Sequence, residues 1–129
     1  MIKTNSNPKT AVIDQIDAVL IQCEKDINSF IESFKDDFLD YFVVKSKTHV
    51  ICVMKQKQFL QLKEWIVIEE DTGKIVQLLQ GGIDFMQRTL LNYRRIQSTN
   101  EMHNLKEEYK LEMFSQLIPL YERMLNMCK

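Results

Sequence analysis

The fold of this chain is decided by residues 8–44, which read PKTAVIDQIDAVLIQCEKDINSFIESFKDDFLDYFVV. Apolar residues recur in this stretch at alternating steps of three and four and then at steps of four, the spacing of a helix that packs along one seam. The seam positions are Ile13, Ile16, Leu20, Cys23, Ile27, Phe30, Phe34, Phe38 and Phe42. Asn7 followed by Pro8 is typical of a helix N-terminus. The pattern predicts one helix over residues 8–44, after a disordered polar tail at residues 1–7.

Three further helices are predicted along the rest of the chain. Residues 48–71 combine apolar side chains at helical spacing with good helix formers. Residues 74–97 continue the same periodicity. The run Ser98-Thr99-Asn100-Glu101 fits a capping box at the start of a fourth helix over residues 99–128.

Two irregularities fall inside the predicted helices. Gly81 and Gly82 each cost a helix about 1 kcal/mol relative to alanine, so the pair marks a close helix crossing, a kink or a break. We expect the close crossing. Pro119 leaves the carbonyl of Ser115 without its helical partner, which predicts a bend or a split in the fourth helix.

Composition supports an all-α, four-helix-bundle-like single domain over residues 8–128. The chain has 129 residues, enough for one core, and its three glycines and two prolines provide few tight turns. The alternative is an α+β fold with a small antiparallel meander in residues 41–80. Three segments there, 41–44, 49–54 and 65–69, are rich in β-branched or aromatic residues, and Gly73 could form a turn.

Cysteine usage and hydropathy predict a cytoplasmic protein. Cys23, Cys52 and Cys128 are an odd number of widely spaced cysteines, and the polar N-terminus carries no secretory signal. A reducing compartment follows. No apolar run approaches the 18 residues that a membrane-spanning helix needs, so we expect no membrane insertion.

The chain contains no motif that points to catalysis. It lacks a glycine-rich phosphate loop, a dinucleotide fingerprint and a nucleophile elbow. His49 and Cys52 are one helical turn apart, but a structural zinc ion needs four ligands. We therefore expect no catalytic residues, no metal, no cofactor and no small-molecule substrate. An enzyme whose carboxylates converge only in the fold, such as Asp36, Asp37 and Asp40, remains a third hypothesis.

Charge is distributed unevenly between the first two predicted helices. Eight acids lie between Asp14 and Asp40, whereas residues 41–63 contain five basic side chains and no acid. The five are Lys45, Lys47, Lys55, Lys57 and Lys63. One interpretation is that the two helices pack antiparallel and their charges face each other. The other is a basic patch for RNA or an anionic surface, although a net charge of −1 provides no general attraction to nucleic acid.

The fourth predicted helix is apolar on more than one face, which favours a role in binding. Its predicted partner-binding residues are Phe114, Leu117, Ile118, Leu120, Tyr121, Met124 and Leu125. Such a surplus suits a dimer mate or a bound helix. The leading hypothesis is a non-enzymatic interaction module, such as an adaptor, a chaperone-like protein or an inhibitory regulator. It would bind a helical or apolar segment of a protein partner, or form a homodimer.

Overall fold

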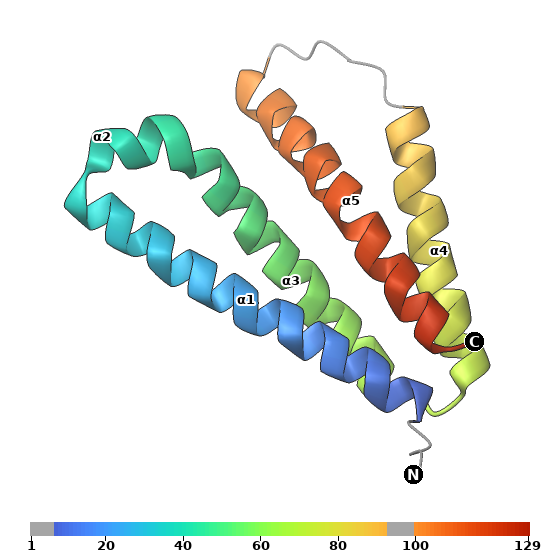
Figure 1. Ribbon diagram of the computed structural model, residues 1–129. Coiled ribbons are helices and arrows are strands. Elements are labelled where there is room, and N and C mark those ends of the chain that lie inside the picture. Colours follow the sequence, from blue (N-terminus) through green and yellow to red (C-terminus); the bar gives the residue numbers. More distant parts are fainter. Residues whose placement is uncertain (1–6, 93–99) are drawn as a thin grey trace.

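The computed structural model describes residues 7–92 and 100–129, and its elements are all helical (Figure 1). They are α1 (Pro8–Asp36), the single turn α2 (Phe38–Asp40), the π-helical segment η1 (Tyr41–Lys45), α3 (Ser46–Ile68), α4 (Thr72–Leu91) and α5 (Glu101–Met127). No strand occurs in the described residues. The all-α prediction is confirmed and the meander over residues 41–80 is wrong, because α3 buries Ile51 and Ile66 in helical packing that overrides their β propensity.

Two helical hairpins form the bundle (Figure 1). The first joins α1 to α3 and the second joins α4 to α5, and α5 also contacts α3 and α1. The core takes residues from all four long helices, including Ile16 of α1, Phe59 of α3, Ile75 of α4 and Leu117 of α5. The four-helix-bundle-like architecture follows from these shared contacts.

The predicted first helix is interrupted near its end. α1 ends at Asp36, and Asp37 adopts an extended conformation with φ −149° and ψ 91°. Its carboxylate accepts a hydrogen bond from the Asp40 backbone N–H at 3.1 Å, so it caps a new turn. The prediction of one helix over residues 8–44 is therefore wrong beyond Asp36. The break does not separate the apolar side chains on its two sides: Phe34 and Phe38 still meet edge to face, with ring centroids 5.2 Å apart.

The other helix boundaries move by a few residues. α3 begins at Ser46, directly after η1 and without a side-chain cap, and ends at Ile68 rather than at residue 71. Asn7 caps α1 as predicted, accepting from the Lys9 N–H at 3.0 Å. Asn100 caps α5 through the His103 N–H, so this helix begins later than the predicted box. Ser98, Thr99, residues 1–6 of the predicted tail and the end of the predicted third helix lie outside the described residues.

The glycine pair marks a close helix crossing, as expected, and only Gly82 forms it. A Cβ on Gly82 would lie 2.9 Å from Cε2 of Tyr121 in α5, whereas a Cβ on Gly81 would meet nothing within 4 Å. α4 continues through both glycines, and α5 continues through Pro119 without being split. The absent side chain of Gly82 thus lets α4 approach α5.

Alanine at these two glycines is expected to change stability in opposite directions. G82A should lower the free energy of unfolding by about 1–2 kcal/mol, because the buried Tyr121 ring must shift. G81A should raise it by about 0.5–1 kcal/mol through helix propensity alone. Urea unfolding of both variants provides the comparison. A G82A protein stabilised as much as G81A would show that the crossing is not close.

Candidate functional site

The seven residues predicted to bind a partner lie in α5, and most of them belong to the protein's own core. Phe114, Leu117, Tyr121, Met124 and Leu125 are buried. Ile118 and Leu120 are partly buried against the same core. Because α5 contacts α1, α3 and α4, other helices of the same chain cover its several apolar faces. The expectation of an exposed surface on this helix is thereby corrected: its apolar surplus is used inside the monomer.

The predicted basic patch is not gathered on one face. Lys47 Nζ lies 3.0 Å from Glu112 of α5, and Lys63 Nζ lies 2.7 Å from Asp17 of α1. Lys57 lines a hollow on the outer side of α3 instead. The Lys63–Asp17 pair joins α3 to α1, as the first interpretation expects, whereas Lys47 faces α5 instead. Each such exposed pair contributes less than about 1 kcal/mol.

His49 and Cys52 have separate partners in the structure. The Tyr41 hydroxyl and His49 Nδ1 are 2.6 Å apart, and the imidazole stacks on Phe30 with centroids 5.2 Å apart. The Cys52 thiol donates to the carbonyl oxygen of Cys23 at 3.6 Å. Within the described ranges, no group of three or more histidine, cysteine or acidic side chains is placed to hold a metal ion.

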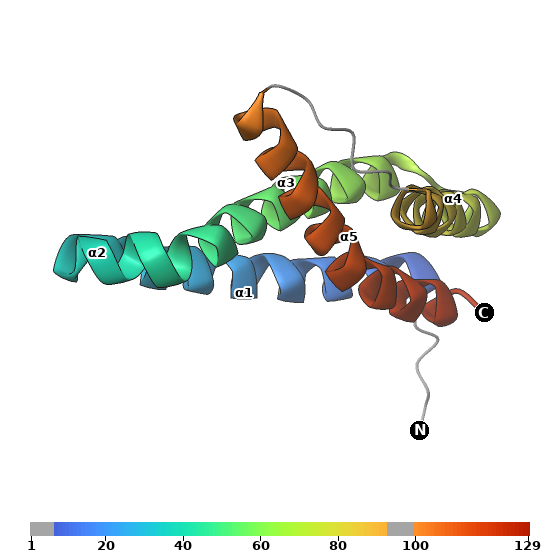
Figure 2. The same cartoon turned by 90° about the horizontal axis from the view of Figure 1, so that it is seen from above.

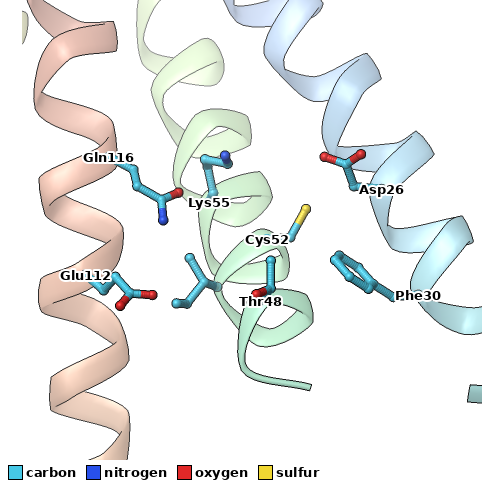
Figure 3. Close-up of a pocket in the computed structure, with 8 residues that line it drawn as sticks. Asp26, Phe30, Thr48, Cys52, Lys55, Glu112 and Gln116 are labelled. Atoms are coloured by element: carbon cyan, nitrogen blue, oxygen red, sulfur yellow. The ribbon is translucent and has the colours of Figure 1, made fainter. Parts of the chain in front are cut away.

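A small polar pocket lies between α1, α3 and α5 (Figure 3). Its volume of about 90 Å³ falls well below the range of about 300–1,000 Å³ typical of ligand sites. Figure 3 shows Asp26 from α1, Lys55 from α3 and Glu112 from α5 around it. In the described part of the chain no buried side-chain nitrogen or oxygen lacks a hydrogen-bond partner. The pocket is therefore a small gap lined by charged and polar side chains.

The three aspartates of the enzyme hypothesis lie where the chain turns. Asp36 and Asp40 would share one face only on a continuous helix, and α1 ends at Asp36. Asp37 caps the new turn, and Asp40 lies 3.5 Å from Lys45. The helical geometry behind a shared carboxylate site is absent.

The end of the α1–α3 hairpin carries a group of exposed apolar side chains, here named the aromatic tip. Its members are Phe34, Phe38, Leu39, Phe42, Val43 and Val44, each between 48% and 77% exposed. They come from α1, α2 and η1, and Figure 2 shows this end of the hairpin extending away from α4 and α5. Among the described residues, the main contacts of α2 and η1 are with each other and with the helices α1 and α3 that they join.

Ring contacts and one lysine hold the aromatic tip in shape. Phe38 lies between Phe34 and Phe42, at centroid distances of 5.2 and 5.8 Å. Lys45 spans the base of the turn, with Nζ 3.1 Å from Ser33 Oγ and 3.5 Å from Asp40. π-helical turns such as η1 are uncommon and often occur at functional sites. The rings are therefore preorganised on the surface while remaining exposed to solvent.

The sequence contains a signal for this tip that the seam pattern obscures. From Phe30 to Phe42 the apolar step is a constant four residues, which rotates about 40° per step around a helix of 3.6 residues per turn. Such a row leaves the seam and moves toward solvent. The adjacent Asp36-Asp37 pair marks the place where the helix stops.

Burial makes Cys52 a poor nucleophile and gives stability a pH dependence. Desolvation raises its thiol pKa from 9.0 to about 11. Between those values the unfolded chain loses the Cys52 proton and the folded chain keeps it, so stability should fall as pH rises from 9 to 11. We expect C52A to lose less stability than wild type over this interval, measured by urea unfolding at each pH. Parallel curves for the two proteins would contradict the assignment.

Membrane insertion finds no support in the helices: none in the described ranges is long and apolar enough to span a bilayer. The aromatic tip is thus a feature of a helical bundle with no candidate span. No protein-family model matches the chain, and comparisons with curated proteins and with solved structures found no match either.

Proposed function

We propose that this protein is a non-enzymatic interaction module that binds an apolar segment of a protein partner through the aromatic tip. The proposal rests on a row of three exposed phenylalanines in ring contact, with exposed Leu39, Val43 and Val44 in the same segment at the end of the hairpin. Single exposed apolar residues are normal on protein surfaces, whereas a contiguous group is typical of a binding site. An adaptor, chaperone-like or regulatory role would use such a surface.

The side chains of the tip suit a protein partner. Aromatic residues, phenylalanine among them, are enriched in protein–protein interfaces, and three phenylalanines here form one row. Holding those rings in contact before binding reduces the entropy lost on association. The row and the flanking leucine and valines can cover one face of an amphipathic helix.

Charge at the tip disfavours the alternative surfaces. Asp36, Asp37 and Asp40 alternate with the apolar side chains, and burying carboxylates in a bilayer is costly. An anionic membrane or RNA would also meet these acids at close range. A partner helix with an apolar face and a neighbouring basic residue instead fits the rings and Asp36, because Asp37 caps α2 and Asp40 already pairs with Lys45.

Site-specific photo-crosslinking in the native host tests the proposal. A photoreactive amino acid is introduced at Leu39 in the tip, and in a second protein at Gln77, an exposed polar position on α4. Adducts are purified under denaturing conditions and identified by mass spectrometry. We expect protein adducts from position 39 that decrease when Phe38 and Phe42 are replaced by serine.

Position 77 is the control for crosslinks that form by chance. Equal adducts from positions 39 and 77 would indicate random collision and overturn the proposal, as would the absence of protein adducts at position 39. Adducts that persist with both phenylalanines removed would show that the tip lies near a partner without binding it.

A further inference from the structure

Helix α3 is apolar on the face opposite its core face. Its inner face buries Ile51, Phe59, Leu62 and Ile66 against the other helices. Its outer face carries five apolar residues that are only partly buried or exposed: Val50, Val53, Leu60, Val67 and Ile68. A helix that is apolar all round is normally buried all round. The outer face of α3 is therefore a second apolar surface, separate from the aromatic tip.

The outer face has the spacing of a coiled-coil seam. Val50, Lys57 and Glu64 are seven residues apart, and so are Val53, Leu60 and Val67, each three residues after a member of the first set. These are the a and d positions of an unbroken heptad pattern. All six lie within α3, so the seam extends for about 27 Å at 1.5 Å per residue.

The two charged residues of the seam select a second copy of this chain as the occupant. Neither Lys57 nor Glu64 has an ion-pair partner among the described residues. If two α3 helices pair antiparallel with Val50 opposite Val67 of the second copy, Glu64 of that copy lies opposite Val53. Lys57 is one helical turn from Val53 and can therefore reach Glu64 of the second copy. The two-fold symmetry forms the same Lys57–Glu64 ion pair a second time. Parallel pairing would instead place like charges together.

Shape at the two ends of the seam is complementary in the same register. A hollow of about 350 Å³ opens at the start of α3, lined by Tyr41, His49, Val50, Val53, Met54 and Lys57. Val67, at the opposite end of the helix, is 47% exposed. With Val50 opposite Val67 of the second copy, Val67 of that copy faces Val50 and Val53 in the wall of this hollow.

We propose that two copies of this protein form an antiparallel, two-fold symmetric dimer through the outer face of α3. Lys57 of each copy pairs with Glu64 of the other, and Val67 of each packs against Val50 at the edge of the hollow. The surface differs from the aromatic tip, so the dimer stands or falls independently of the proposed partner. It would present two tips on one particle.

Charge reversal tests this dimer. Sedimentation equilibrium should show a concentration-dependent dimer for wild type. K57E and E64K each create two like-charge pairs and should each raise the dissociation constant about tenfold or more. The K57E/E64K double variant should restore the wild-type value, and an equimolar mixture of the two single variants should form a heterodimer.

Control variants separate this surface from others. K25E, at an exposed position on α1, should leave the dissociation constant unchanged. L60E should abolish the dimer, with helix content by circular dichroism as the check on folding. A wild-type protein that remains monomeric at all concentrations would overturn the proposal. So would single reversals without effect, or a double variant no tighter than either single one.

Discussion

Replacing Leu117 with alanine is expected to lower the free energy of unfolding by about 3 kcal/mol or more. Leu117 is 0% exposed in the core of the bundle. Truncating a fully buried leucine removes its apolar burial and leaves a cavity that the surrounding helices fill only in part. Chemical unfolding monitored by circular dichroism measures the change.

The matched control is L91A, at a leucine that is 84% exposed at the end of α4. It should change stability by no more than about 0.5 kcal/mol. A Leu117 variant as stable as L91A would mean that this part of α5 is a surface, as the sequence pattern alone predicted. The pair therefore distinguishes core from binding site by stability alone.

Serine at both Phe38 and Phe42 is expected to weaken binding of the crosslinked partner by about thirtyfold or more. Each removed ring is an exposed aromatic anchor, and loss of one such anchor commonly costs about 2 kcal/mol or more of binding free energy. Titration calorimetry with the identified partner segment gives the affinity. The free energy of unfolding should change by less than about 1 kcal/mol, because both rings are more than half exposed.

A second double variant controls for general loss of apolar surface. F85S/L91S removes two exposed apolar side chains from α4 and should bind the partner with wild-type affinity. Equal losses from the two double variants would contradict a site at the tip. A large loss of stability in F38S/F42S would show that the phenylalanines serve the fold rather than a partner.

The sequence predicted the helices well because each is encoded locally. The seam up to Phe30, the cap Asn7 and the scarcity of glycine and proline are properties of short stretches. The break at Asp37 was missed because it depends on one carboxylate competing with the helix for backbone groups, against a continuing apolar period. The sequence predicted a close helix crossing at the glycine pair, but it could not identify Tyr121 as the residue that Gly82 contacts.

The candidate site was harder to predict than the fold, because apolar periodicity does not say which side chains another helix covers. Phe114 and Phe42 both lie on apolar helical patterns. α5 lies against three other helices and buries the first, whereas the second lies at the end of a hairpin beyond their reach. Likewise, five lysines in one segment of sequence suggest a basic patch, but in the folded protein they point toward different neighbours.

Chemical-shift mapping with the crosslinked partner segment tests the central claim most directly. Backbone amide signals of the isotopically labelled protein are followed as the unlabelled segment is added. We expect the largest shifts within residues 34–45, at the aromatic tip. Largest shifts within residues 114–125 of α5, with an unchanged tip, would contradict the claim.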